Sequence, residues 1–310
     1  MRRRITIIGL TAGLVVLVGV GIGLGVVVAQ GSSERPAADL ERTAAGEILV
    51  SPEWVQANAG EITILEYGRA HEDFTAGHIP GAAFVPREVA WDSVDGIDGM
   101  LPAPELVARD LEDAGVRSDR PVVVYDGGNG LWSSRLFWAL EYLGHTSVHV
   151  LDGGVAAWSA SGYELSREII PPARGEFVPN LRPQLIADAA YILDHLSTEG
   201  SNVAILDTRS PGEYQGTDVR SARGGHIPGS VNIEWTAGAG SDGRFRPLAE
   251  LAETYADVID ENTDVITLCQ TGVRGAHTYV VLRVLGHEEA RVYDGSWAEW
   301  GNDPELPVEL

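Results

Sequence analysis

The sequence predicts an α/β protein with two similar domains, each a parallel sheet flanked by helices, after an N-terminal membrane-anchor or signal helix. Three observations support this prediction. A set of motifs occurs twice in the same order. Short β-rich segments alternate with stretches of helical periodicity. A long uncharged run follows three arginines at the start of the chain.

The first 30 residues are predicted to form the anchor or signal. Arginines at 2–4 precede an uncharged run over residues 5–29. These 25 residues exceed both the about 20 that cross a bilayer as a helix and the about 7–15 of a signal-peptide core, which favours an anchor. Small residues at 27–29 leave a cleaved signal open. Because arginines favour the cytoplasmic side, residues 31–310 are expected to be extracytoplasmic, membrane-anchored or secreted.

The predicted repeat defines the two domains. Three motifs return 142–148 residues later: Gly-His-Ile-Pro-Gly at 77–81 and 225–229, Leu-Gly-His at 143–145 and 285–287, and Asp-Gly followed by Trp at 152–158 and 294–300. Their common order indicates two copies of a unit of about 120 residues, the size of a domain. The chain then divides into a signal or anchor over 1–30, a linker over 31–45, an N-terminal domain over 46–166, an interdomain linker over 167–183 and a C-terminal domain over 184–310.

Each copy alternates strands with helices. Buried strands are predicted at 62–65, 122–125 and 148–151 and again at 203–206, 265–268 and 290–293, with helices at 134–143 and 275–285. This alternation is typical of parallel sheets with helices on both faces. Ligands of open parallel sheets bind beyond the carboxyl ends of the strands, so catalytic residues are expected there.

Composition excludes several classes of function. Asp and Glu number 45 against 22 Lys and Arg, a net charge of −23, which offers no basic face to a nucleic acid. All 22 cations are arginine, which excludes a lysine Schiff base. The single cysteine excludes an intrachain disulfide, a zinc ribbon and a C-x-x-C redox pair. No metal or organic cofactor is indicated.

The candidate nucleophile is Cys269. It follows a predicted strand, and the loop Cys269, Gln270, Thr271, Gly272, Val273 and Arg274 leads into a helix. Unpaired N–H groups and the helix dipole stabilise an anion there, so the thiol is expected to react as a thiolate. Gly272 lets the loop curl, and Arg274 brings a positive charge near the sulfur or its substrate. A lone cysteine is also often a small buried core residue, and position alone leaves both interpretations open.

Four motifs of the second copy, in this order, resemble the tandem-domain rhodanese family of thiosulfate and 3-mercaptopyruvate sulfurtransferases. They are Leu-Asp-Thr-Arg-Ser-Pro-Gly-Glu-Tyr at 206–214, Gly-His-Ile-Pro-Gly-Ser-Val-Asn at 225–232, the loop at 269–274, and Asp-Gly-Ser-Trp-Ala-Glu-Trp at 294–300. The repeat extends the resemblance over residues 45–305. It implies two rhodanese-like domains with catalysis in the C-terminal one. The repeat offset places Gly127 opposite Cys269, so the N-terminal copy offers no thiol there.

The resemblance implies ping-pong sulfur transfer through a persulfide on Cys269, from a small-molecule sulfur donor to cyanide or a thiol. The chain departs from the family pattern around the donor site. Gln270 and Thr271 replace a basic pair or a Gly-Ser pair, Arg274 stands in place of threonine, and Glu213 stands where a substrate-binding arginine is usual. We expect thiosulfate as donor because Arg274 suits a dianion, with mercaptopyruvate and other sulfane or persulfide donors as alternatives.

Several residues are expected to support the loop. Asp207 and Arg209 follow a strand and are predicted to form a buried ion pair or hydrogen-bond network that holds it. Trp297 is predicted to pack in the core or to wall the pocket. His226 lies in a turn that the copy without a thiol shares, which favours a structural role. His277, on the helix after the loop, is predicted to lie at the surface.

Two alternative functions stay open. The first is a cysteine phosphatase or arsenate reductase, because some phosphatases share the fold implied here. Their spacing is C-x5-R, whereas Cys269 and Arg274 have C-x4-R, which makes a tighter ring of amides. The second is a non-catalytic module that carries or binds sulfur, which the missing basic residues at 270 and 271 favour.

Overall fold

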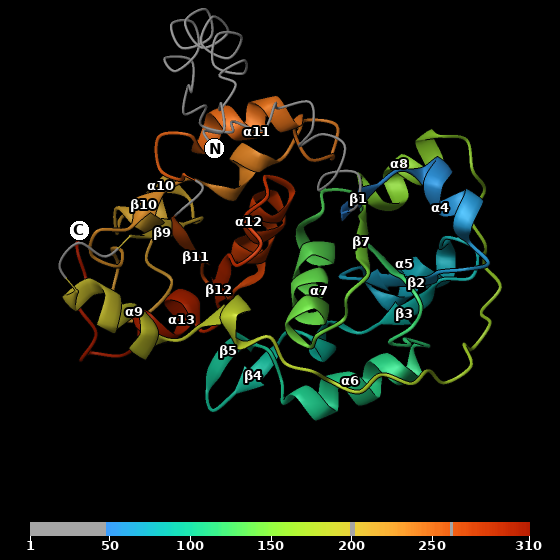
Figure 1. The fold of residues 1–310 in the computed structure, drawn as a ribbon, viewed down its shortest axis with the longest axis horizontal. Helices are drawn as coiled ribbons and strands as arrows, with labels where there is room; N and C mark the ends of the chain where they lie inside the picture. Colours follow the sequence, from blue (N-terminus) through green and yellow to red (C-terminus); the bar gives the residue numbers. More distant parts are fainter. Residues whose placement is uncertain (1–47, 199–201, 261–262) are drawn as a thin grey trace, which may run out of the picture. The chain divides into compact units, whose positions relative to one another are not determined.

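The computed structural model describes residues 48–198, 202–260 and 263–310 and contains two five-stranded parallel sheets, one from each predicted copy (Figure 1). The first has the order β1-β7-β6-β2-β3. Its strands are β1 (Leu49–Val50), β7 (Val148–Leu151), β6 (Val122–Tyr125), β2 (Thr63–Tyr67) and β3 (Ala83–Val85). A separate antiparallel hairpin, β4 (Asp92–Val94) and β5 (Ile97–Met100), follows β3 in the chain.

The second sheet repeats this order strand for strand, as β8-β12-β11-β9-β10. Its strands are β8 (Ile186–Ala187), β12 (Arg291–Tyr293), β11 (Asp264–Leu268), β9 (Val203–Asp207) and β10 (Val231–Asn232). The predicted α/β fold with a parallel sheet in each copy is therefore confirmed. The parallel register pairs Leu268 at the end of β11 with Asp207 at the end of β9, so the residues that follow both strands meet at one edge.

Helices connect the strands of each sheet. In the N-terminal copy they are α4 (Pro52–Asn58), α5 (His71–Ala76), α6 (Pro104–Asp113), α7 (Leu131–Tyr142) and α8 (Gly154–Ala160). In the C-terminal copy they are α9 (Ala189–Ser197), α10 (Pro211–Tyr214), α11 (Leu248–Tyr255), α12 (Val273–Val284) and α13 (Ser296–Trp300). Short 3-10 turns occur at η1 (Arg87–Val89), η2 (Pro183–Leu185) and η3 (Trp235–Gly238).

Successive strand residues point to opposite faces and enter different apolar clusters. In β6, Val122 and Val124 join a cluster that extends through both copies, whereas Val123 and Tyr125 join one confined to the N-terminal copy. In β11, Val265 joins the shared cluster and Ile266 joins one confined to the C-terminal copy. Both faces of each sheet are thus buried, which explains the continuous apolar runs in the sequence.

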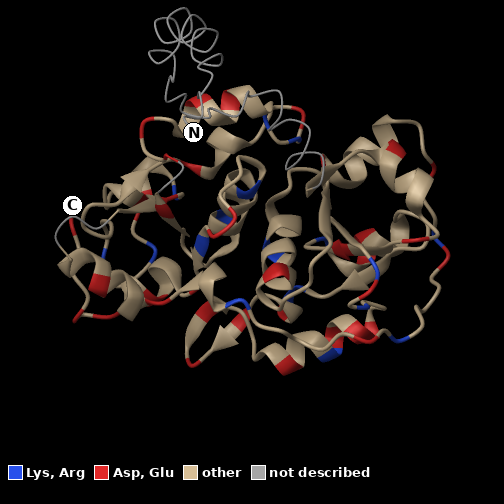
Figure 2. Ribbon diagram, viewed as in Figure 1, with Lys and Arg blue, Asp and Glu red and all other residues tan. Residues whose placement is uncertain are grey.

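The shared cluster lies where α7 packs against α12, so the two copies meet through equivalent helices (Figure 1). At the carboxyl ends of these helices, Glu141 accepts a hydrogen bond from the Tyr279 hydroxyl (2.6 Å) and two from Arg283 (2.9 and 3.0 Å). The described residues all belong to one compact unit that extends from Leu40 to Leu310. Figure 2 shows Asp and Glu spread along helices and loops around both sheets.

Two helices begin earlier than predicted, and one side chain lies elsewhere. The helix after Cys269 begins at Val273 rather than Gly275, and its counterpart begins at Leu131 rather than Ser134. The prediction that His277 lies at the surface is wrong: its side chain is fully buried. The reason is that α12 packs against α7 of the other copy, so the face opposite its own sheet is not exposed to water.

Among the helices of the described residues, none combines the length and the apolar character that a membrane crossing needs. The run at 5–29, predicted to be an anchor or signal, and the linker at 31–45 lie outside the described residues.

Candidate active site

Cys269 lies between the end of β11 and the start of α12. Gly272 caps the helix with a left-handed backbone (φ 76°), so the connection turns sharply within four residues. The Cys269 side chain is 1% exposed. The structure thus bears out the predicted strand–cysteine–helix order, and it places the thiol in a region that largely excludes water.

Ser296 and the first turn of α13 hold the loop in place. The N–H groups of Cys269 and Gly272 both donate to the Ser296 hydroxyl (3.2 Å each), which in turn donates to the Tyr293 carbonyl (2.8 Å). The carbonyls of Cys269 and Gln270 accept hydrogen bonds from the N–H groups of Trp297 and Ala298. The Gln270 side chain donates to the Ser221 hydroxyl (3.1 Å). These bonds fix the backbone conformation of the loop.

The remaining amides of the loop are free. Within the described residues, no backbone or side-chain acceptor bonds the N–H groups of Gln270, Thr271, Val273, Arg274 and Gly275. They lie in the loop and in the first turn of α12, at the positive end of the helix dipole. A loop of this kind can stabilise negative charge on a thiolate, a persulfide or a departing anion.

Arg274 is paired with Glu213 at the end of the loop. Its guanidinium donates to both carboxylate oxygens of Glu213, at 2.6 and 2.8 Å. Burial alone lowers the pKa of Arg274, but hydrogen bonds to Glu213 and the adjacent Cys269 side chain outweigh burial and raise it. Burial opposes ionisation of Glu213, yet hydrogen bonds from Arg274 and Ser210 lower the pKa of this carboxyl to about 2. Both groups are therefore charged at neutral pH.

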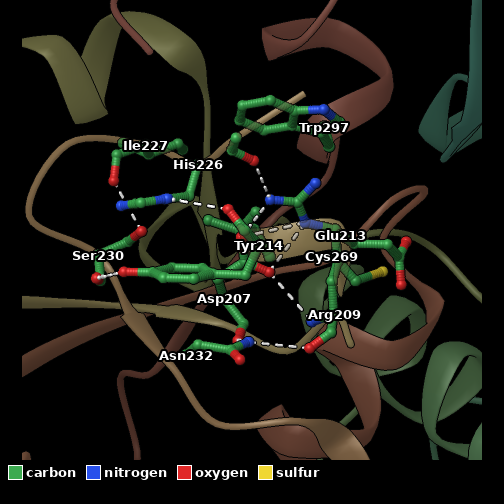
Figure 3. Close-up of polar contacts among 12 residues, drawn as sticks. Asp207, Arg209, Glu213, Tyr214, His226, Ile227, Ser230, Asn232, Cys269 and Trp297 are labelled. Carbon is green, nitrogen blue, oxygen red and sulfur yellow. Dashed lines mark hydrogen bonds and ion pairs between the residues drawn. The ribbon is translucent and has the colours of Figure 1, made fainter. Parts of the chain in front are cut away.

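Asp207 and Arg209 form the predicted buried ion pair. The Arg209 guanidinium donates to both carboxylate oxygens of Asp207, at 2.5 to 3.0 Å, and to the Gly225 carbonyl (2.8 Å). Its guanidinium carbon lies 4.2 Å from the ring centre of Trp297, which is itself buried (Figure 3). Because the Trp297 N–H bonds the Cys269 carbonyl, this network supports the loop from below.

His226 also has a structural environment. Its ring stacks on Tyr214 with centres 3.7 Å apart, and its Nδ1 bonds the Tyr214 carbonyl at 3.0 Å (Figure 3). In the other copy, His78 stacks on Phe74 and bonds its carbonyl in the same manner. The equivalence agrees with the structural role predicted for this histidine.

The N-terminal loop at 126–130 is built differently. The carboxylate of Asp126 accepts hydrogen bonds from the N–H groups of Gly128, Asn129, Gly130, Trp132 and Ser133, at 2.9 to 3.3 Å. An internal carboxylate therefore occupies the amides that correspond to the free ones near Cys269. The N-terminal loop lacks both a thiol and unpaired amides.

The structure brings all of the predicted site residues to the carboxyl edge of the second sheet, and Val273 is part of the core there. Sequence reasoning missed Glu213 and Ser296 as partners of the loop. Glu213 had one local signal, the Ser-Pro-Gly-Glu capping box at 210–213, which the structure forms. Ser296 had none beyond its place after the repeated Asp-Gly motif.

The chain matches a family model described as "Rhodanese-like domain" twice, over residues 51–161 and 188–303. The thiosulfate sulfurtransferase of Pseudomonas aeruginosa is 39% identical over 239 residues, which cover 76% of this chain and 87% of that protein. The sulfur carrier protein TtuD of Thermus thermophilus is 33% identical and covers 84% of this chain and 96% of its own.

A solved structure, the 3-mercaptopyruvate sulfotransferase SseA of Escherichia coli, superposes with a TM-score of 0.70 at 28% identity over 80% of this chain and 98% of its own. Its title describes a "Rhodanese" fold. Together with the two domain matches and the relatives above 30% identity, the geometry leads to one assignment: the chain belongs to the rhodanese family of sulfurtransferases.

Proposed function

We propose that this protein transfers a sulfane sulfur from thiosulfate to cyanide or a thiol through a persulfide on Cys269. The observation that carries the proposal is the position of the chain's single thiol in a loop of free amides, beside a charged arginine. The relatives named as thiosulfate sulfurtransferases support it.

The first half-reaction loads the enzyme. The Cys269 thiolate attacks the outer sulfur of thiosulfate and forms an S–S bond. The S–S bond within thiosulfate breaks, and sulfite leaves with the electron pair. A thiolate that meets a dianion is repelled by several kcal/mol in a partly dry site, on a scale of about 4 kcal/mol per pair of unit charges at an effective dielectric of 20. The free amides of the loop and the guanidinium of Arg274 offset this repulsion.

The second half-reaction unloads it. Cyanide, or a thiolate, attacks the outer sulfur of the persulfide and takes it as thiocyanate or a new persulfide. The bonding pair returns to Cys269, which regenerates the thiolate. The same amides stabilise the charge in both steps, so a single loop serves donor and acceptor.

The choice of thiosulfate over mercaptopyruvate rests on Arg274 and on the names of the relatives. The guanidinium can face an anionic donor on one side while Glu213 neutralises it from the other. The proposal extends to location: the apolar run at 5–29 would hold residues 31–310 outside the cytoplasm, anchored or, after cleavage, secreted. It also keeps the domain boundaries given above.

A second candidate function is sulfur relay without turnover of small donors. The relative named sulfur carrier protein TtuD favours it, as it aligns with 84% of the chain at 33% identity. In that case Cys269 would hold a persulfide delivered by another protein, and small donors would load it poorly.

Intact mass spectrometry tests the proposal. The full chain, purified in mild detergent, is weighed before and after thiosulfate, with Cys269→Ser as the matched control. We expect a gain of one sulfur, about 32 Da, which cyanide removes with release of thiocyanate, and no gain in the variant. If thiosulfate leaves the wild-type mass unchanged, thiosulfate is not the donor. If only a protein persulfide loads Cys269, the relay function replaces the enzymatic one.

A further inference from the structure

Arg135 lies on α7 of the N-terminal domain, yet its side chain extends to the loop that bears Cys269. It is fully buried. Its guanidinium donates to the carbonyls of Ala90 (2.7 Å) and Gly99 (2.9 Å) in its own domain. Its Nη1 lies 2.7 Å from a carboxylate oxygen of Asp294 in the other domain. Arg135 thus joins the hairpin that contains Gly99 to the C-terminal domain.

The partners of Arg135 lie against the loop itself. Nη1 is 2.6 Å from the point where a Cβ on Gly272 would lie, so the guanidinium packs directly on the residue that caps α12. The other carboxylate oxygen of Asp294 accepts the Leu101 N–H at 2.7 Å. A Cβ on Gly99 would come within 2.4 Å of the Thr271 Cβ. The N-terminal domain therefore covers the loop at Thr271 and Gly272.

The repeat supplies a comparison within the same molecule. Asp152, which lies 142 residues before Asp294, accepts the Phe245 N–H at 2.9 Å, just as Asp294 accepts the Leu101 N–H. A Cβ on Gly130, the counterpart of Gly272, would come within 2.7 Å of the Phe245 ring. Each domain thus covers the equivalent loop of the other with an equivalent backbone contact.

The two sides differ at the position of Arg135. Its counterpart, 142 residues later, is His277. The His277 ring stacks on Phe245 with centres 4.6 Å apart, and neither ring nitrogen has a hydrogen-bond partner within the described residues. The buried cation with four polar contacts is therefore found on the side that faces the thiol, and an unpaired ring is found on the side that faces the loop without one.

We infer that Arg135 is a positioning residue of the active site, through which the N-terminal domain holds the Cys269 loop by way of Asp294 and Gly272. The inference rests on Cys269 being the nucleophile, as proposed above. Its physical basis is that a guanidinium fixed by two carbonyls and a carboxylate cannot shift without moving the cap of α12. A displacement of about 1 Å at a reacting group can cost a hundredfold in rate.

Arg283 provides the matched control. It also forms an ion pair across the domain interface, to Glu141 at 2.9 Å, but at the opposite ends of α7 and α12. If Arg135 served only to hold the domains together, Arg283→Ala would have the same effect on chemistry as Arg135→Ala. A role in positioning predicts that only Arg135→Ala changes the reactivity of Cys269.

The experiment measures two rates in the full chain: sulfur loading from thiosulfate, by intact mass, and alkylation of Cys269 by iodoacetamide. Because Cys269 is the single cysteine, alkylation reports on it alone. We expect loading to fall about tenfold or more in Arg135→Ala, with an altered alkylation rate, and to stay at the wild-type level in Arg283→Ala. Thermal unfolding of both variants accompanies the rates.

Two further variants cover a failure of Arg135→Ala to fold. Arg135→Lys should retain part of the rate, and Arg135→His, which carries the residue of the other side, should not. Equal rates in Arg135→Ala, Arg283→Ala and wild type, or equal rates in the Lys and His variants, would overturn the inference. If the wild type takes no sulfur from thiosulfate, the proposed function fails, and the alkylation rates alone decide on Arg135.

Discussion

Arg274 donates hydrogen bonds to both carboxylate oxygens of Glu213, so the charge of the loop arginine is already shared with an acid when a donor arrives. Glu213 is in turn fixed by Ser210, whose hydroxyl and N–H both donate to the same carboxylate oxygen. The guanidinium is held at a set place beside Cys269 and its net charge is reduced. This relationship separates two roles of Arg274, in structure and in donor binding, that experiment can test apart.

Arg274→Ala should raise the KM for thiosulfate about tenfold, because a favourable contact with an anion worth about 1.4 kcal/mol is lost. It should also lower the free energy of unfolding by about 3 kcal/mol, since it leaves Glu213 buried without its partner. Steady-state kinetics and urea unfolding check both. The double variant Glu213→Gln with Arg274→Ala should regain most of the stability while KM stays high. An unchanged KM in both variants would remove the donor-binding role of Arg274.

Stability should fall in acid through Glu213. Burial opposes its ionisation, but hydrogen bonds from Arg274 and Ser210 lower the folded-state pKa to about 2, below the unfolded value near 4.5. Such a group contributes stability that is present above pH 4.5 and is lost as the pH falls through about 2. The contribution is up to about 3 kcal/mol. Urea unfolding from pH 5 to pH 2 should therefore show a shallower pH dependence in Glu213→Gln. An identical slope would mean that Glu213 is not coupled to folding.

The sequence predicted the strands and the repeat well, and it failed at contacts between distant segments. The strand predicted at 122–125 coincides with β6, because both faces of the sheet are buried and its residues form an unbroken apolar run. The loop at Cys269 was found because a thiol between a strand and a helix is visible in the local pattern. Its partner Glu213 lies 61 residues away, and no local pattern records which acid an arginine will meet.

The same limit explains His277 and Arg135. Helix α12 is buried on nearly every side because it packs against its own sheet and against α7, and a helix face covered by another domain has no signature in its own sequence. The ion pair between Arg135 and Asp294 joins two domains, so only the three-dimensional structure reveals it. Repeat alignment nevertheless identifies the residues to compare once the contacts are known.

His277 should be replaceable by phenylalanine with a gain in stability. The ring lies between Phe245 and Trp235, and its buried nitrogens lack partners. Burial lowers the folded-state pKa of His277 to about 3, below the unfolded value near 6.5. Its neutral form therefore contributes stability above pH 6.5 that is lost as the pH falls toward 3. His277→Phe should match or exceed wild type by about 1 kcal/mol at pH 7 and by about 2 kcal/mol more at pH 5.

His277→Ala is the control for that change. It should remove the same pH dependence but lose about 3 kcal/mol at both pH values, because it leaves a cavity between the aromatic rings. Chemical unfolding at pH 7 and pH 5 gives both quantities. A loss of stability in His277→Phe would show that the ring nitrogens have a polar partner in solution.

A cysteine placed in the N-terminal loop should not create a second active site. Gly127 corresponds to Cys269, and a Cβ there would meet only the Arg69 side chain, at 3.8 Å, so Gly127→Cys fits without strain. The amides that could stabilise its thiolate already donate to Asp126. In a Cys269→Ser background, Gly127→Cys should gain no sulfur from thiosulfate, as intact mass would show. Alkylation by iodoacetamide confirms that the new thiol is accessible. A gain of one sulfur would mean that a strand–cysteine–helix arrangement suffices without free amides.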